Sequence, residues 1–157
     1  MPFPNFDPCM PVLLHEIAKR HAKRTMIVRG TQRLSYADVE QRSRALARAL
    51  LADGVGKGTR VGLLFPNGPD WVIAWAATAR IGAIAVPLNT FQQARELGWM
   101  LRHADVDTLL LCDRFLSHDY LERLEQLAPS LRDADAGAPR LAVRELPFLR
   151  RVVVRGE

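Results

Sequence analysis

A strand–helix–strand segment in the middle of the chain constrains the fold more than any other stretch. It begins with the apolar run Val61–Phe65, which ends at the turn-forming residues Pro-Asn-Gly at 66–68. This run is too short for a helix and too apolar for a strand with one face in water, so we expect a strand buried on both faces. A helix is predicted to follow, because Pro69 suits a first helical turn and Asp70 suits the positive end of the helix dipole.

The second half of this segment completes the pattern. Apolar residues keep helical spacing from Trp71 to Ile81, with Trp75 expected to be buried between helix and sheet, and Gly82 suits the end of a helix. Ala83–Val86 then reads as a second buried strand. Two buried strands joined by one helix predict a right-handed crossover between parallel strands, and therefore an α/β fold.

Similar elements are predicted on either side of this segment. Helices are expected over Pro11–Lys23, after Ser35 (a capping box with Asp38), over Gln92–His103 (capped by Thr90) and after Ser117 as cap. Strands are expected at Met26–Arg29 and Arg33–Leu34 (an antiparallel hairpin), Thr108–Cys112 and Val152–Val154. The predicted fold is a partial parallel sheet with helices on both faces, plus a short N-terminal antiparallel hairpin.

The same patterns divide the chain into four regions. Residues 1–10 are expected to form an N-terminal tail, and residues 11–128 an α/β subdomain. Residues 129–147 are rich in Asp, Ala, Gly, Pro and Arg without periodicity, so we expect a surface linker. Residues 148–157 are expected to hold the final strand, after which the parallel sheet is still incomplete.

Charge and composition exclude several classes of function. The net charge is +5, but basic and acidic residues alternate and no basic run is interleaved with aromatic residues, so no nucleic-acid partner is predicted. The longest apolar tract, Trp71–Leu88, is interrupted by Arg80 and Gly82, and no transmembrane segment is predicted. No signal peptide is visible, and the two cysteines are too few for a disulfide framework, so a cytoplasmic location is expected.

The residues with catalytic potential form no recognisable site. None of the four histidines (His15, His21, His103 and His118) has a partner at metal-binding spacing, and Cys9 and Cys112 are isolated thiols. Gly54–Thr59 contains a Gly-Lys pair, but it lacks the spacing of a phosphate-binding loop and joins a helix to a strand instead of a strand to a helix. The sequence therefore assigns no catalytic, cofactor-binding or metal-binding residue.

Several short motifs, taken in order, carry a family resemblance. They are Arg33-Leu34-Ser35-Tyr36-Ala37-Asp38-Val39, Gly54-Val55-Gly56-Lys57-Gly58-Thr59-Arg60-Val61, Phe65-Pro66-Asn67-Gly68, Gly82-Ala83-Ile84-Ala85-Val86-Pro87-Leu88-Asn89 and Pro147-Phe148-Leu149-Arg150-Arg151-Val152-Val153-Val154. Together they resemble the amino-terminal part of the AMP-forming acyl-CoA synthetase, adenylation-domain and firefly-luciferase superfamily. Ser35 stands where that family usually has Thr, and Thr59 where it usually has Asp.

This resemblance implies a ligase activity for a full-length parent enzyme. Such enzymes join a carboxylic acid to ATP in the presence of Mg and then transfer the acyl group to CoA. The resemblance implies that the substrate of the parent enzyme is a fatty acid or another carboxylic acid. The family's phosphate-binding loop, Mg-binding Glu, ribose-binding Asp and catalytic Lys all lie downstream of the motifs matched here. The resemblance therefore implies no cofactor in this chain itself and an N-terminal fragment that is inactive alone.

A second interpretation belongs to a different class of function. The chain could act as a non-catalytic interaction or regulatory module that uses the unfinished sheet edge to bind a partner or a second copy of itself. The sequence leaves both interpretations open.

Overall fold

The computed structural model describes residues 9–134, 138 and 140–156. The chain divides into two compact units, each considered separately below. Unit 1 comprises Met1–Lys57 and Asn67–Ala83, and unit 2 comprises Gly58–Pro66 and Ile84–Glu157. Most of the predicted N-terminal tail, residues 1–8, lies outside the described residues, and the first helix begins at Met10.

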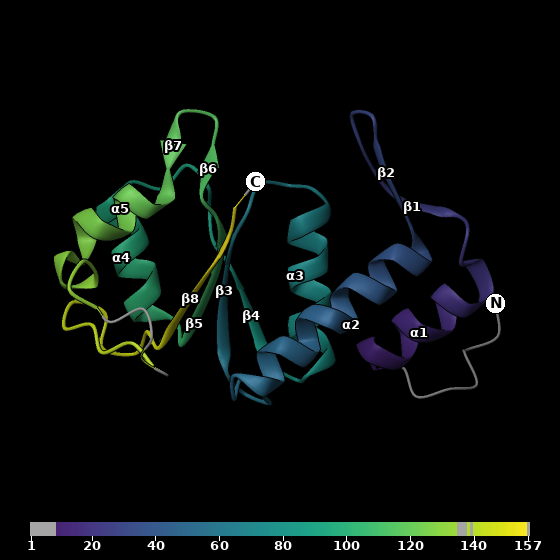
Figure 1. Cartoon of the computed structure of the whole chain (residues 1–157), viewed down its shortest axis with the longest axis horizontal. Helices are drawn as coiled ribbons and strands as arrows, with labels where there is room; N and C mark the ends of the chain where they lie inside the picture. Colours follow the sequence, from purple (N-terminus) through teal and green to yellow (C-terminus); the bar gives the residue numbers. More distant parts are fainter. Residues whose placement is uncertain (1–8, 135–137, 139, 157) are drawn as a thin grey trace. The chain divides into compact units, whose positions relative to one another are not determined.

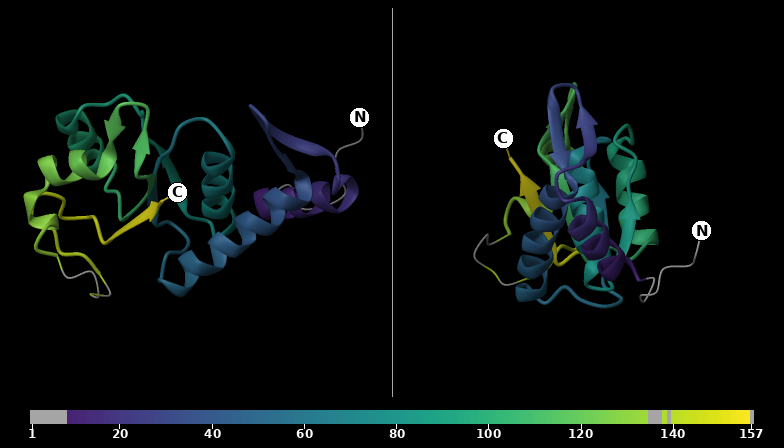
Figure 2. Two further views of the ribbon diagram at one scale, coloured as in Figure 1. Left: turned by 45° about the horizontal axis from the view of Figure 1, so that its top comes forward. Right: turned by 90° about the vertical axis from the view of Figure 1, so that its right-hand side faces the viewer.

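Unit 1 is helical with one β-hairpin. Its elements are α1 (Met10–His21), β1 (Thr25–Arg29), β2 (Gln32–Ser35), α2 (Tyr36–Ala52) and α3 (Pro69–Arg80). Strands β1 and β2 pair antiparallel, which confirms the predicted hairpin, and Figure 2 shows this hairpin at the N-terminal end of α2.

The capping box predicted for α2 is present. The Asp38 backbone N–H donates to Ser35 Oγ at 3.1 Å, while the Ser35 backbone N–H donates to Asp38 Oδ2 at 2.8 Å. Two N–H groups that the helix leaves without partners are thereby satisfied, so the residue at which the chain turns from β2 into α2 is set locally. The hydrogen bonds from Ser35 lower the pKa of Asp38 from its ordinary value.

A polar network joins the three helices of unit 1 through Glu40 on α2. The Glu40 carboxylate accepts from Arg80 of α3 and, at 2.5 Å, from Arg44 of α2, and it lies 3.4 Å from His15 Nδ1 of α1. Arg80 also donates through Nε to Ser43 Oγ at 3.1 Å. The side chains of Arg80 and Glu40 are 9% and 12% exposed, so this ion pair is largely shielded from water.

Trp75 was predicted to be buried, but it is less buried than predicted. Trp75 is half-buried, as is Trp71, and the fully buried side chains of α3 are Pro69, Ile73, Ala74, Ala76, Ala77 and Thr78. The two indole rings lie at i and i+4 and stack on each other, with centroids 6.4 Å apart and planes 8° apart. Each ring therefore shields one face of the other on a helix whose inner positions are occupied by small residues.

Unit 2 contains the predicted parallel sheet. Its elements are β3 (Arg60–Leu64), β4 (Ile84–Pro87), α4 (Ala94–His103), β5 (Thr108–Cys112), β6 (Arg114–Phe115), β7 (His118–Asp119), α5 (Tyr120–Leu127), a 3₁₀ turn η1 (Pro129–Leu131) and β8 (Arg151–Arg155). Four strands pair in the order β4-β3-β5-β8, all parallel (Figure 1). The strand–helix–strand order with parallel pairing, and hence the α/β fold class, is confirmed.

The central strands β3 and β5 are buried on both faces. Leu64, Leu109 and Leu111 face α4 and α5 in one apolar cluster with Leu97, Leu101, Tyr120 and Leu124. The alternate side chains, Val61, Leu63 and Leu110, are also at most 2% exposed. The near-continuous apolar runs in the sequence are explained by this two-sided burial.

Gly62, in the middle of β3, is tightly packed on its core face. A Cβ built there would lie 3.0 Å from Leu109 Cδ1, 3.1 Å from Val106 Cγ1 and 3.3 Å from Leu88 Cδ1. Three core side chains therefore pack directly against the backbone of the central strand.

Two predicted helix caps are wrong. α4 begins at Ala94 because Gln93 and Glu96 form its capping box, whereas Thr90 lies in the preceding loop. α5 is capped by Asp119, whose Oδ1 accepts from the Glu122 N–H at 2.9 Å. Ser117 instead lies between β6 and β7, in a short hairpin that the sequence analysis did not predict.

The predicted surface linker at 129–147 is in part a packed segment. Its described residues include the turn η1, and Val143 and Leu146 are each 2% exposed within the same cluster as the sheet. A backbone hydrogen bond joins the two ends of residues 141–150, since the Leu141 N–H donates to the Arg150 carbonyl at 2.8 Å. Residues 135–137 and 139 of this segment lie outside the described part.

Candidate functional site

The carboxyl edge of the parallel sheet in unit 2 is the part of the fold where ligands bind in open α/β proteins. The connections from β3 to β4 and from β4 to β5 leave in opposite directions, so the switch point lies between β3 and β5. The loop after β4 (Leu88–Gln93) and the β6–β7 hairpin after β5 both follow strand ends at this edge. The hairpin is drawn in green at the top of Figure 1.

Arg123 of α5 ties these two segments together. Its Nη1 donates to the Gln92 carbonyl at 2.6 Å, and its Nη2 donates to His118 Nδ1 of the hairpin. Because a guanidinium can only donate, His118 Nδ1 is the acceptor of this hydrogen bond. The Arg123 guanidinium carbon also lies 5.6 Å from the centre of the Tyr120 ring.

Tyr120 also holds the loop after β4. Its side chain is fully buried, and its hydroxyl donates to the Thr90 carbonyl at 3.0 Å. Burial raises the pKa of the Tyr120 phenol above its ordinary value of 10.0, with a contribution in the same direction from Cys112. The phenol is therefore neutral at physiological pH and acts as a hydrogen-bond donor.

Apolar side chains lie exposed above this network. Phe91 is 59% exposed and meets His118 edge-on at 5.7 Å, while Leu116 at the hairpin tip is 75% exposed. Leu116 has a φ of 54°, a left-handed conformation that leucine rarely adopts. Strained backbone with an exposed apolar side chain is more common at binding sites than elsewhere, so Phe91 and Leu116 form a candidate contact surface.

The glycine-rich loop Gly54–Thr59 begins with two amides that are bonded to the helix before it. It connects α2 to β3, as predicted, and its first two amides already have partners. The N–H groups of Gly54 and Val55 donate to the carbonyls of Leu51 and Leu50 at 3.0 and 2.9 Å. These two hydrogen bonds end the helix, so the two amides are not available to a phosphate group.

The remaining histidines and cysteines are separated in the structure. His15 lies beside Glu40 and Arg44, His21 beside Tyr36, and His103 stacks on Trp99 at 4.5 Å. Cys9 is exposed, and Cys112 is half-buried with its Sγ 3.9 Å from the Leu64 carbonyl. Within residues 9–134, 138 and 140–156, no three His, Cys, Asp or Glu side chains gather where they could hold a metal ion.

The polar side chains at the carboxyl edge therefore hold the loop after β4 and the β6–β7 hairpin in place. Tyr120 and Arg123 donate to the backbone carbonyls of Thr90 and Gln92, and Arg123 also donates to the His118 side chain of the hairpin. These bonds hold the loop that carries Phe91. Sequence reasoning missed this network because its members are far apart along the chain. The only local signal in the sequence was that Tyr120 and Arg123, which follow His118, are three residues apart and therefore lie on the same side of a helix.

The chain matches one known protein family over most of its length. The family model described as AMP-binding enzyme matches residues 14–151. YngI of Bacillus subtilis (strain 168), provisionally named an acyl-CoA synthetase, is 32% identical over 146 residues, covering 92% of this chain and 26% of the relative. The human mitochondrial medium-chain acyl-CoA ligase ACSF2 is 30% identical over 145 residues, covering 92% of this chain and 23% of the relative. The chain thus spans about a quarter of the length of these relatives.

Solved structures support the fold. The anthranilate CoA ligase AuaEII, in complex with anthranoyl-AMP, superposes with a TM-score of 0.75 at 24% identity, covering 98% of this chain and 26% of that one. The N-terminal domain of FACL13 from Mycobacterium tuberculosis superposes with a TM-score of 0.74 at 21% identity, covering 94% of this chain and 34% of that one. At these identities the likeness concerns the fold.

Proposed function

This chain belongs to the AMP-binding enzyme family, and from that premise we propose that it is the N-terminal part of an AMP-forming acyl-CoA synthetase. The proposed reaction of the whole enzyme joins a carboxylic acid, such as a fatty acid, to ATP and then passes the acyl group to CoA. The observation that carries this proposal is the family match over residues 14–151, together with relatives named as acyl-CoA synthetases along 92% of the chain.

We further propose that this chain alone is inactive and supplies a scaffold. ATP, Mg and CoA would be held by residues outside it, because the one glycine-rich loop that resembles a phosphate cradle has its first amides bonded to helix carbonyls. The contribution of this chain would be the parallel sheet and the ordered loop at its carboxyl edge. The exposed Phe91 and Leu116 would then contact the remainder of the enzyme or its substrate.

Two measurements test the proposal. Calorimetry of the purified chain with Mg-ATP should show no binding, and a micromolar site would overturn the scaffold role. Reading the DNA after the codon for Glu157 should reveal a Thr/Ser/Gly-rich segment ending in Pro-Lys-Gly. Unrelated sequence at that place would argue against a synthetase parent.

A second candidate function rests on the edge strand β8. β8 pairs with β5 alone among the described strands, and Val153 and Val154 are 38% and 40% exposed. The corresponding proposal is self-association, in which a second copy of the chain pairs along β8. Sedimentation should then show a concentration-dependent dimer that Val153→Lys abolishes; a monomer at all concentrations would eliminate this alternative.

The compartment is also a proposal. No helix within the described residues has the length and apolar character to cross a membrane, and both cysteines are free. A reducing compartment such as the cytoplasm suits these thiols. Fractionation of cells that express the full reading frame tests this location, which the human relative does not share by name.

A further inference from the structure

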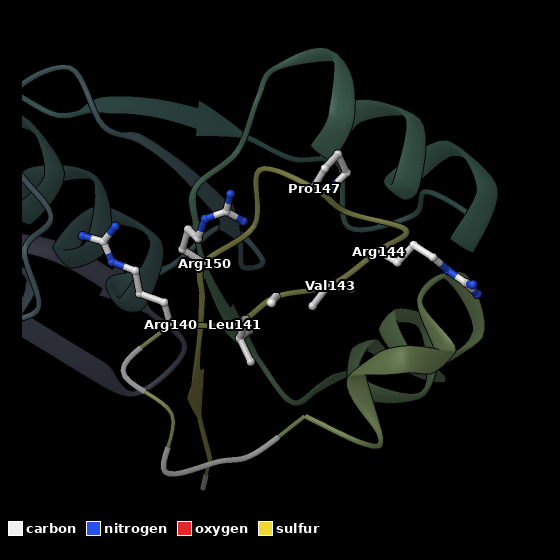
Figure 3. Close-up of a pocket in the computed structure, with 7 residues that line it drawn as sticks. Arg140, Leu141, Val143, Arg144, Pro147 and Arg150 are labelled. Carbon is white, nitrogen blue, oxygen red and sulfur yellow. The ribbon is translucent and has the colours of Figure 1, made fainter.

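The packed segment between η1 and β8 forms a hollow that lies apart from the carboxyl-edge loops. Its lining residues are Arg140, Leu141, Ala142, Val143, Arg144, Pro147 and Arg150, and its volume is about 560 Å³ (Figure 3). That volume falls within the range of small-molecule sites. Among the described residues that line the hollow, three are arginines and none is acidic.

The backbone that carries these arginines is anchored in the core. Val143, Leu146 and Leu149 are each at most 2% exposed and belong to the same cluster as the central strands. Leu141 and Arg150 are joined through the backbone at 2.8 Å, and the Arg150 N–H donates to the Asp107 carbonyl at 2.7 Å. The backbone of the hollow is therefore held in shape before any ligand arrives, which lowers the entropic cost of ordering this segment on binding.

Arg140 and Arg150 form the cationic end of the hollow. In Figure 3 their side chains lie on the same side of the loop, whereas Arg144 points away at the opposite end. Within the described residues the Arg140 guanidinium has no hydrogen-bond or ion-pair partner, and the Arg150 guanidinium donates only to the carbonyl of Leu149, at 3.2 Å. Arg144 has an acidic neighbour, Glu145, at 3.7 Å, and Glu145 also accepts from Ser130.

We propose that this hollow binds an organic phosphate, with the phosphate at the end that Arg140 and Arg150 line and the apolar part against the apolar residues of the lining. Two guanidinium groups without a lining carboxylate suit a dianion better than a monoanion, because each can donate a pair of hydrogen bonds to phosphate oxygens. The apolar residues beside them favour a ligand that carries a hydrophobic group next to its phosphate. The site is independent of the proposed ligase activity.

The probe for this site is phenyl phosphate, titrated calorimetrically into the full chain at low ionic strength. We expect it to bind at least ~10-fold more tightly than inorganic phosphate, which lacks the apolar part, or benzoate, which is a monoanion. Equal affinity for phenyl phosphate and benzoate would overturn the assignment to a phosphate. Equal affinity for phenyl phosphate and inorganic phosphate would overturn the role of the apolar surface.

Variants separate a built site from general attraction to a basic protein. The double variant Arg140→Gln, Arg150→Gln should weaken phenyl phosphate binding at least ~10-fold, and Arg144→Gln less than ~3-fold. Arg48→Gln, in an exposed position on α2, removes one charge elsewhere and should change the affinity less than ~2-fold. A loss in Arg48→Gln like that of Arg140→Gln alone would contradict the proposal. Melting curves identify variants that have lost the fold. If the double variant does not fold, Arg140→Gln alone, at an exposed position, provides the deciding measurement.

Discussion

The two units of this chain are stabilised in different ways. Unit 2 has a large apolar cluster, in which Leu109 and Leu111 of the central strand are completely buried. Unit 1 has an apolar cluster around Leu34, Val39 and Ile73, and it adds a shielded ion pair between Glu40 and Arg80. Apolar burial does not depend on pH, whereas an ion pair does, so the units should respond differently to mutation and to acid.

The largest expected effect lies in the core of unit 2. Leu111→Ala should lower the free energy of unfolding by about 3–4 kcal/mol, because it leaves a cavity at a site with no exposed surface. Chemical denaturation measures the loss, and hydrogen exchange of the β3 and β5 amides locates it. Val154→Ala on the neighbouring β8, where the side chain is 40% exposed, is the control and should cost less than about 1 kcal/mol. Equal costs would show that the sheet core is not the main source of stability.

The next effect concerns the ion pair of unit 1. Arg80→Met should destabilise by about 2–3 kcal/mol, because it leaves the shielded Glu40 carboxylate without its main partner. Arg44 contacts the same carboxylate but is 48% exposed, so Arg44→Met should cost less than about 0.5 kcal/mol. Denaturant titration of both variants makes the comparison, and similar losses would mean that shielding from water is unimportant here.

Trp75→Ala should have a smaller effect than full burial would predict. The side chain is half-buried and stacks on Trp71, so we expect a loss of about 1–2 kcal/mol. Fluorescence of the remaining tryptophans should also change, because the stacked pair is broken. A loss above about 3 kcal/mol would indicate that Trp75 belongs to the core after all.

The smallest expected effect is a loss of unit 1 stability at acidic pH, which is absent near neutral pH. Burial alone would raise the pKa of Glu40, but the charge of Arg80 and hydrogen bonds from Arg80, Arg44 and His15 together hold that pKa below its ordinary 4.5. The stabilisation is therefore complete above pH 4.5 and is lost as the pH falls through the lowered pKa. Hydrogen exchange in α2 and α3 should accelerate with acid in the natural chain and less steeply in Glu40→Gln. An identical pH dependence in both would exclude Glu40 as the cause.

Much of the fold could be predicted from local sequence patterns. The apolar runs at β3 and β5 and the Ser35–Asp38 box each identify their element within a few residues, because burial or capping there depends on neighbours in sequence. The caps at Thr90 and Ser117 were wrong because several residues near each helix start can cap, and packing decides which one does.

The candidate sites were less predictable than the fold. Arg123 reaches Gln92 across 31 positions in sequence, and no periodic pattern reports such a contact. The arginine-lined hollow was concealed in a segment whose composition is typical of a linker. The three-residue spacing of Val143, Leu146 and Leu149 was a signal that this segment packs against the core.

The bare backbone at Gly62 has a consequence for how this protein can evolve. With Leu109 Cδ1 3.0 Å from the place of a methyl group, an alanine at position 62 requires the Leu109 side chain to move by a few tenths of an ångström. Alanine at position 62 should therefore be tolerated better when position 109 carries a smaller residue than leucine. Mutational libraries should vary these two codons as a pair.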